Sequence, residues 1–303
     1  MKINEIPTPF FLLDERSLQG ELSLLKNALN QYWANYTIGY SVKTNSLPAL
    51  ASILRQKDVS AEVVSEDEYA VISRVGYLPA NIICNGPIKQ ENWIHELLDK
   101  DIKFNIDSHC EVEYVCKYAA LHKQKRYSVG LRVNLDVNRI FPDESNAEDG
   151  CSRFGFSDAS GELSAVIEKL SQCSNVTIAG LHLHISTKCR RPEVYRWLVT
   201  VFASVVHKYH LTAIQYLDIG GGFYGGMPNK PSWNEYLQEI SEELSLQGFS
   251  AEKLMLIVEP GVSLLAGCLS YFTKIVDIKT NINQSFAVCD GSRIHIDPLM
   301  HKS

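Results

Sequence analysis

The feature of this sequence that most restricts its fold is an alternation between short apolar runs and longer helical segments. Eight runs are rich in Val, Ile or Leu, as strands buried on both faces are: YTIGYSV, SAEVVS, NIICNG, IKFNID, YSVGLRVN, TIAGLHLHI, IQYLDIGGG and KLMLIVEPG. This alternation is typical of βα units in a parallel sheet. Eight units within about 250 residues predict a (β/α)8 barrel, although the strand count alone also allows a doubly wound open sheet.

The segments between these runs carry helix-terminus signals. Three Ser-x-x-Glu sequences, at 65–68, 108–111 and 232–235, each fit a capping box. Gly76 and Gly248 each follow a helical pattern and fit its end.

Composition restricts the partners and the location of the chain. The 303 residues carry a formal net charge of -6, which argues against nucleic acid or an anionic membrane as the main partner. No apolar run approaches the roughly 20 residues that span a bilayer. The eight cysteines form no C-x-x-C pair, and the N-terminus lacks a signal-peptide pattern. We therefore expect a cytoplasmic protein with reduced thiols.

In a barrel of this type, active-site groups lie at the carboxyl ends of the strands. Those ends carry polar or small residues throughout: Lys43, Ser65, Asn85, Asp107, Arg132, Asn134, His182, His184, Gly220 to Gly222 and Glu259. If the barrel closes, all of them meet at one mouth, however far apart they lie in the sequence.

Three of these positions have two interpretations each. Lys43 is either a solvated strand end or an amine whose pKa is lowered by burial, so that it forms a Schiff base. The glycine run 220–222 is either a flexible loop that needs positive φ or a close approach to a phosphate. Glu259 either pairs with a nearby basic side chain or faces the protonated ring nitrogen of a pyridine cofactor.

His182 and His184 lie two residues apart and therefore face the same side of their strand. They could be metal ligands, with Asp107 and Glu259 completing a hydrolytic site. An imidazole stacked on an aromatic cofactor ring agrees better with an amine, a phosphate cradle and a carboxylate at the same mouth. Together these groups predict a pyridoxal 5'-phosphate site and no metal.

The chain resembles the fold-type III pyridoxal-phosphate decarboxylases, the family of diaminopimelate and ornithine decarboxylases, over residues 7 to about 300. The matching segments occur in the family's order: TPFFLLD, YSVKTN, AEVVSEDEY, NIICNGPIK, FNIDSHCEVE, GLRVN, SRFGF, GLHLHIST, LDIGGGF and VEPG. The resemblance implies decarboxylation at the α-carbon of an amino acid, with a basic or diamino substrate such as diaminopimelate, ornithine or lysine. It also implies a homodimer.

The resemblance implies a role for each matching residue. Lys43 would carry the cofactor covalently, His184 would stack on its ring, and Glu259 would pair with the ring nitrogen. The remaining implied cofactor-binding residues are Glu62, Arg132, Thr187, Gly220, Gly221, Gly222, Pro260 and Gly261. The ring would then accept the charge left when CO2 departs.

Two departures from the family pattern affect this interpretation. The family continues Glu-Pro-Gly with an arginine that helps hold the phosphate, whereas this chain has Val262, followed by Ser263. Residues 14–266 match the barrel, and 1–13 with 267–303 match only the beginning of a second, β-rich domain. Cys289-Asp290 lies too early to be identified with the family's Cys-Asp motif, which completes the partner subunit's site. A catalytically silent relative that acts through a protein partner is therefore the alternative.

An acidic segment follows the fifth predicted strand and contains Asp143, Glu144, Glu148 and Asp149. Carboxylates there would suit the terminal amine of a basic amino acid. A solvated acidic loop is the other interpretation.

Overall fold

The computed structural model describes residues 5–142, 144–145 and 152–296. The chain forms two compact units, one from residues 23–263 and the other from residues 1–22 together with 264–303. Each division lies inside a helix, α1 (Glu15–Tyr32) or α9 (Val262–Leu265).

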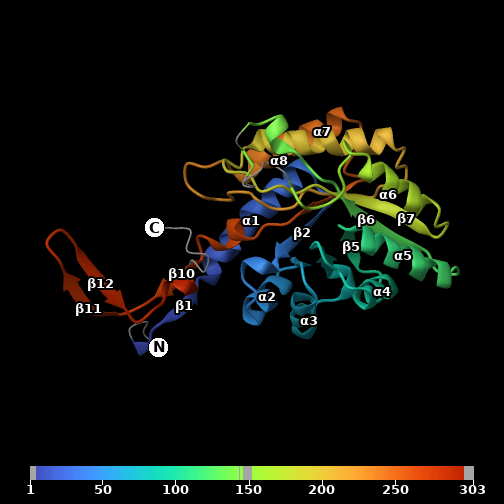
Figure 1. The fold of residues 1–303 in the computed structure, drawn as a ribbon. Helices are drawn as coiled ribbons and strands as arrows, with labels where there is room; N and C mark the ends of the chain where they lie inside the picture. The colour runs from blue at the N-terminus through green and yellow to red at the C-terminus, as the bar shows by residue number, and fades with distance from the viewer. Residues whose placement is uncertain (1–4, 143, 146–151, 297–303) are drawn as a thin grey trace. The chain divides into compact units, whose positions relative to one another are not determined.

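Eight parallel strands form a closed barrel in which each strand pairs with the next along the chain. Figure 1 shows the ribbon of this unit, with β2, β5, β6 and β7 labelled. The barrel closes because β9 pairs with β2, with Tyr36 opposite Leu256 and Ile38 opposite Val258. The strands are β2 (Tyr36–Ser41), β3 (Ser60–Val63), β4 (Ile82–Cys84), β5 (Lys103–Ile106), β6 (Tyr127–Arg132), β7 (Val176–His182), β8 (Tyr216–Asp218) and β9 (Met255–Val258). The predicted (β/α)8 barrel is confirmed, and the open sheet is wrong because it would leave β2 and β9 unpaired.

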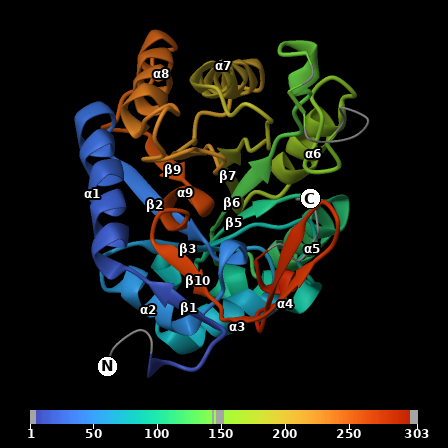
Figure 2. The same cartoon turned by 90° about the vertical axis from the view of Figure 1, so that its left-hand side faces the viewer.

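Helices alternate with the strands and lie around them (Figure 2). They are α2 (Pro48–Arg55), α3 (Glu66–Val75), α4 (Glu91–Asp99), α5 (His109–Leu121), α6 (Glu162–Ser171), α7 (Pro192–Lys208) and α8 (Trp233–Leu246), and a 3-10 turn (Val42–Thr44) follows β2. Gly76 and Gly248 follow α3 and α8 with φ of 94° and 84°, so both predicted helix ends are confirmed.

The predicted helix starts are confirmed in part. Ser232 forms a complete capping box with Glu235. Ser65 accepts the Glu68 N–H at 3.2 Å, but the Glu68 carboxylate accepts the Val64 N–H at 2.9 Å rather than that of Ser65. Ser108 likewise accepts the Glu111 N–H, at 3.5 Å. The serine side of the prediction therefore holds at α3, α5 and α8, and the glutamate side only at α8.

The barrel interior is apolar toward the amino ends of the strands and polar toward their carboxyl ends. A buried hydrophobic cluster draws one residue from each of four strands: Ile83, Ala179, Tyr216 and Ile257. Two residues further along β8 and just past the end of β9 lie Asp218 and Glu259, which are 0% and 5% exposed. Because strand side chains alternate with a period of two, the same inward-facing rows supply first the packing and then the acids.

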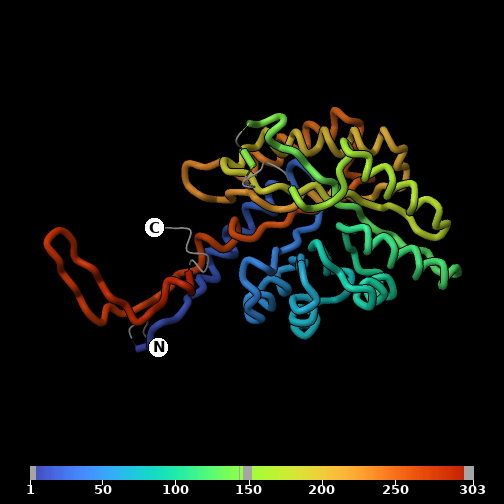
Figure 3. Tube along the Cα trace, viewed as in Figure 1, coloured from blue at the N-terminus to red at the C-terminus, as the bar shows by residue number. Residues whose placement is uncertain are grey.

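The unit formed by the chain ends contains two antiparallel strand pairs. β1 (Phe10–Leu13) pairs with β10 (Leu269–Phe272), and β11 (Ile275–Thr280) pairs with β12 (Ser285–Cys289). The second pair is a long hairpin, which Figure 3 traces, and every residue of β11 is exposed. The predicted β-rich segment after the barrel is therefore present. In the described part of the chain, no helix is both long and apolar enough to cross a bilayer.

Candidate active site

A cavity of about 170 Å³ lies at the carboxyl ends of β2, β7, β8 and β9. Its lining consists of Ser41, Lys43, Thr44, His184, Ser186, Arg190, Gly221, Gly222, Phe223, Glu259, Gly261, Val262 and Ser263. The lining contains six residues that the sequence predicted for the site: Lys43, His184, Gly221, Gly222, Glu259 and Gly261. The barrel thus brings together residues separated by more than 200 positions in the chain.

The position of Lys43 is fixed by contacts between the end of β2 and the segment after β9. The Ser41 N–H donates to the Pro260 carbonyl at 3.1 Å. A Cβ on Gly261 would overlap the Thr44 hydroxyl, so glycine is needed for this close approach. Lys43 itself is exposed, so the structure does not bury this amine.

His184 is oriented by the glycine run after β8. The Gly221 N–H donates to His184 Nδ1 at 3.3 Å, and a Cβ on Gly220 would lie 2.5 Å from the same nitrogen. Because Nδ1 accepts this bond, the ring proton belongs on Nε2. Burial, together with the positive charges of Arg132 and Lys43, lowers the pKa of His184 to about 3. The imidazole is therefore neutral at physiological pH.

A hydrogen-bond network fixes the buried acids. Asn85 Nδ2 donates to Glu259 Oε1 at 2.6 Å and to Glu62 Oε1 at 3.3 Å. Asn105 Nδ2 donates to Asn85 Oδ1 at 2.8 Å and to Asp218 Oδ2 at 3.1 Å. Five strands are thereby linked through side chains inside the barrel.

The Asp218 and Glu259 carboxyls are both buried, and each affects the pKa of the other. Burial raises the pKa of Glu259 well above its usual value, and the negative charges of Asp218 and Glu62 raise it further. Burial also raises the pKa of Asp218, to about 7. The protein alone therefore favours the protonated form of Glu259, whereas the carboxylate predicted from the sequence is the form opposite a protonated pyridine nitrogen.

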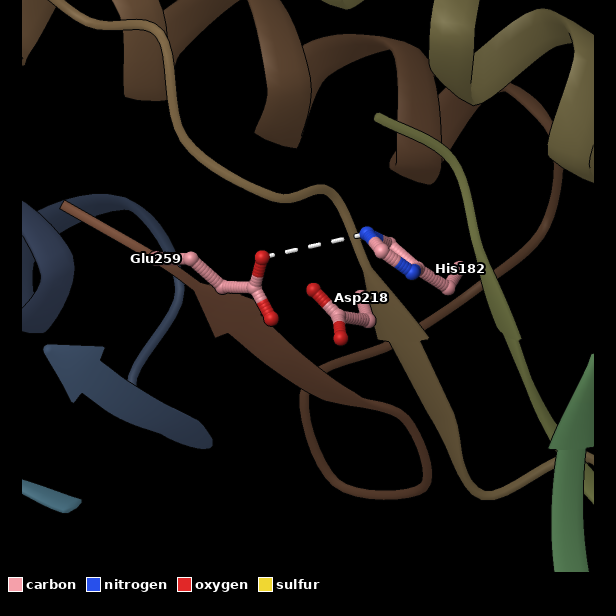
Figure 4. Close-up of side chains that lie close together, drawn as sticks. All are labelled: His182, Asp218 and Glu259. Carbon is pink, nitrogen blue, oxygen red and sulfur yellow. Dashed lines mark ion pairs between the residues drawn. The ribbon is translucent and has the colours of Figure 1, made fainter. Parts of the chain in front are cut away.

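The same region contains a group that could hold a metal ion. One ligand atom each from His182, Asp218 and Glu259 lies within 4.8 Å of the others, and Figure 4 shows the three side chains converging. His182 Nε2 lies 3.8 Å from Glu259 Oε2. This set differs from the predicted metal alternative, because Asp107 instead pairs with Arg132 at 2.9 Å.

Five predicted cofactor-binding residues lie outside the cavity lining: Glu62, Arg132, Thr187, Gly220 and Pro260. Glu62 accepts the Ser41 hydroxyl at 2.7 Å, so it supports the strand that leads to Lys43. Arg132 is held by Asp107 and stacks over the Phe154 ring at 4.3 Å. The structure therefore gives Glu62 and Arg132 separate partners.

Thr187 is not among the residues that line the cavity. Its side chain is buried, and its hydroxyl accepts the Arg190 N–H at 3.1 Å. The neighbouring Ser186 lines the cavity instead. Thr187 thus shapes the loop after β7, and Ser186 supplies that loop's hydroxyl at the cavity.

The acidic segment is only partly described, because Asp143, Glu148 and Asp149 lie outside the described residues. Glu144 is 2% exposed. It pairs with Arg191 at 2.8 Å and accepts the Cys189 N–H at 3.0 Å. These contacts tie the segment to the loop after β7, so Glu144 is not available to bind a substrate amine.

Asp290, of the Cys289-Asp290 pair, forms hydrogen bonds within its own unit. Asp290 accepts hydrogen bonds from the Thr8 and Thr273 hydroxyls at 2.5 and 2.7 Å and from the Lys274 N–H at 2.9 Å. It joins the two strand pairs of its own unit.

Sequence reasoning missed Asp218, Asn105 and Arg190. Asp218 and Asn105 were hidden because each lies within an apolar run, where a polar residue at an inward position was the available signal. Arg190 lies in a loop, and nothing in the sequence shows that this loop returns to the cavity.

The donor set suits one kind of ligand. An amine, a neutral imidazole face and an acid line one cavity with a glycine run, hydroxyls and an arginine. These are the groups that an aldehyde, an aromatic ring, a ring nitrogen and a phosphate require. The fold and the site define a (β/α)8 barrel built for a pyridoxal-type cofactor.

Comparison with known proteins agrees with a pyridoxal-type cofactor. A family model described as the pyridoxal binding domain of pyridoxal-dependent decarboxylases matches residues 16–266. This chain belongs to that family, and its cofactor is pyridoxal 5'-phosphate. The diaminopimelate decarboxylase of Bacteroides thetaiotaomicron is 27% identical over 300 residues, which cover 96% of this chain and 75% of that protein.

Two solved structures share the fold. The diaminopimelate decarboxylase of Helicobacter pylori complexed with L-lysine has a TM-score of 0.79 at 21% identity, covering 95% of this chain and 71% of that one. The lysine/ornithine decarboxylase of Vibrio vulnificus complexed with putrescine has a TM-score of 0.76 at 22% identity, with coverages of 95% and 72%.

Proposed function

We propose that the chain catalyses the pyridoxal-phosphate-dependent decarboxylation of a basic or diamino acid. The observation that carries the proposal is the single cavity in which Lys43, His184 and Glu259 meet. The family match supports the cofactor, and the names of the relatives, diaminopimelate and lysine/ornithine decarboxylases, support the substrate class.

Each of the three residues has a part in this proposal. Lys43 is an exposed amine at the mouth and would hold the cofactor through its aldehyde. His184 is neutral and fixed by Gly221, so its ring face can cover an aromatic ring without adding charge. When bound, the cofactor supplies an electron sink for the charge that develops at the substrate α-carbon.

Glu259 would control the proton at the cofactor's ring nitrogen. Its raised pKa means that it holds a proton in the protein alone, so it is able to give that proton to a basic nitrogen. Asn85, which donates to Glu259 at 2.6 Å, would hold the resulting carboxylate in place.

The substrate part of the proposal rests on the relatives rather than on Glu144, which is already paired with Arg191. We further propose a homodimer, as the resemblance implies; sedimentation analysis of the purified chain tests it.

The test is release of CO2 by the cofactor-loaded protein from meso-diaminopimelate, L-ornithine, L-lysine and L-glutamate, beside Lys43→Ala. We expect release from at least one of the first three substrates and none from the variant. A cofactor-loaded protein that releases CO2 from none of them would favour the silent relative. Release from L-glutamate alone would overturn the substrate class.

A further inference from the structure

We propose that Arg190 is the cation that binds the cofactor's phosphate, at a site where Val262 offers no charge. This inference rests on the proposed function, because it concerns the same cavity. Val262 is 51% exposed and lines that cavity with an apolar side chain. A phosphate carries between one and two negative charges at neutral pH, so its site requires N–H donors and positive charge.

The glycine run alone offers few donors. The Gly220 N–H donates to Asp218 Oδ1 at 3.1 Å, and the Gly221 N–H donates to His184 Nδ1 at 3.3 Å. Of the three glycines, only Gly222 has an N–H without an acceptor among the described residues. The expectation that this run holds the phosphate through several N–H groups therefore needs a further donor.

Arg190 is placed to be that donor. It follows β7, lines the cavity with Ser186, Gly222 and Ser263, and is partly buried. A guanidinium has five N–H donors in a planar fork that fits phosphate oxygens. One of its nitrogens, Nη1, donates to the Phe223 carbonyl at 3.3 Å. Among the residues that the structure describes, no Asp or Glu forms an ion pair with Arg190.

The order of strands places Arg190 at the correct end of the cavity. Neighbouring strands around the barrel run β7, β8, β9 and β2. Arg190 follows β7, and Lys43 is in the turn after β2. The two cations of the lining therefore come from opposite ends of this arc, with the glycine run and Glu259 between them. A cofactor with its aldehyde at Lys43 can then direct its phosphate toward Arg190.

The backbone of Arg190 is held in an uncommon conformation. Its φ is +46°, in the left-handed region that residues with a Cβ rarely adopt. Thr187 accepts its N–H, and the Tyr236 hydroxyl donates to its carbonyl at 2.6 Å. The guanidinium carbon lies 5.1 Å from the centre of the Tyr224 ring. The surrounding groups thus determine where the side chain points, as is common for strained residues at binding sites.

The experiment compares the affinities for pyridoxal 5'-phosphate and for pyridoxal, which lacks the phosphate, by absorbance titration of the purified chain. For Arg190→Ala we expect the Kd of the phosphorylated form to rise about 10- to 100-fold, the loss of a charge-assisted contact. The Kd of pyridoxal should stay within about twofold. Arg190→Lys should recover part of the affinity. Lys188→Ala removes an exposed cation of the same loop that does not line the cavity, and it should change neither value.

Inorganic phosphate gives a second readout. It should compete with pyridoxal 5'-phosphate for the unmodified chain and lose this competition in Arg190→Ala. Equal loss of both affinities in Arg190→Ala, or no loss of either, would overturn the role of Arg190 and leave the proposed function standing. If the unmodified chain bound neither form, the proposed function itself would be wrong.

Discussion

Asn85 donates a 2.6 Å hydrogen bond to Glu259, joining the carboxyl end of β4 to that of β9 across the barrel interior. The two strands are not neighbours in the sheet, so the bond runs through the polar layer above the apolar cluster. It directs one oxygen of the acid to a neutral donor and leaves the other 3.8 Å from His182. The orientation of Glu259 is therefore set by the barrel before any ligand binds.

Replacing Glu259 tests its control of the ring proton. Glu259→Gln should still bind the cofactor at Lys43, but its kcat should fall about 100-fold or more, because an amide cannot transfer the proton. Asn85→Ala keeps the acid but removes its orienting bond, together with the bonds that Asn85 makes to Glu62 and Asn105, and about a tenfold loss is expected. Steady-state kinetics of the loaded variants measures both. A Glu259→Gln enzyme within twofold of the parent would contradict this role.

Asp218 should make stability depend on pH. Its pKa is raised in the folded protein to about 7, so the folded state binds more protons than the unfolded chain between pH 4 and 7. The parent therefore loses stability from this group as pH rises through that window. Asp218→Asn has no such group, so its stability relative to the parent should increase steadily from pH 4 to 7 in urea unfolding of the cofactor-free chain.

His182 and His184 change the stability with pH in the opposite direction, but their contributions cancel when the variant is compared with the parent. Burial lowers the pKa of His182 and of His184, so each favours the folded state above its unfolded pKa and loses that contribution as pH falls. Both remain in parent and variant. A stability difference that stayed flat across the window would show that Asp218 titrates normally.

The sequence predicted the scaffold well and the internal connections less well. The strand pattern located all eight barrel strands, because burial on both faces leaves a continuous apolar run. The partners of Glu259 were not predictable, because Asn85 and Asp218 reach it only after the barrel closes. The raised pKa of Glu259 in the protein alone follows from that packing.

Gly220 should be required for His184. Gly220→Ala places a Cβ 2.5 Å from His184 Nδ1 and forces alanine to a φ of +68°, so the ring must move. We expect cofactor affinity to fall at least tenfold, the equivalent of about 1.4 kcal/mol. Gly248→Ala is the control, since it has a φ of +84° but no atom within 4 Å of the added Cβ.

The control should lose about 1 kcal/mol of stability through backbone strain and keep its cofactor affinity. Titration and thermal unfolding of both variants separate the two effects. Equal affinities in the two variants would mean that Gly220 matters only for its backbone conformation.

Lys89 and Glu111 form a buried ion pair at 3.0 Å, with 0% and 1% of their side chains exposed. The sequence assigned Glu111 to a capping box. Its carboxylate accepts the N–H groups of Asp107 and Lys89, at 2.8 and 2.9 Å, in addition to pairing with the Lys89 amine. Lys89→Met leaves this acid without its cation and should reduce the free energy of unfolding by about 3–5 kcal/mol.

The exposed pair of Lys100 and Glu96, at 2.6 Å, is the matched control. Lys100→Met should cost less than about 1 kcal/mol, because solvent already screens both charges. Urea unfolding of the two variants gives the comparison. Similar costs would contradict the strong dependence on burial that the structure implies.

The paths of the loops were also not predictable from the sequence. The Ser-Thr-Lys segment after β7 was expected to place Thr187 at the phosphate, but the chain turns so that Thr187 is buried and Ser186 and Arg190 line the cavity. That turn depends on the positive φ of Arg190 and on the hydroxyl of Tyr236, which is 46 residues away. No local pattern encodes such a contact.

Identification of the modified lysine tests most directly whether Lys43 holds the cofactor. The purified chain is incubated with pyridoxal 5'-phosphate, reduced with borohydride, digested and analysed by mass spectrometry. We predict one stoichiometric pyridoxyl-phosphate adduct, on Lys43, and its absence in Lys43→Ala. A folded protein that carries no adduct at Lys43, or that is labelled there no more than at its other exposed lysines, would rule out Lys43 as the cofactor-binding lysine.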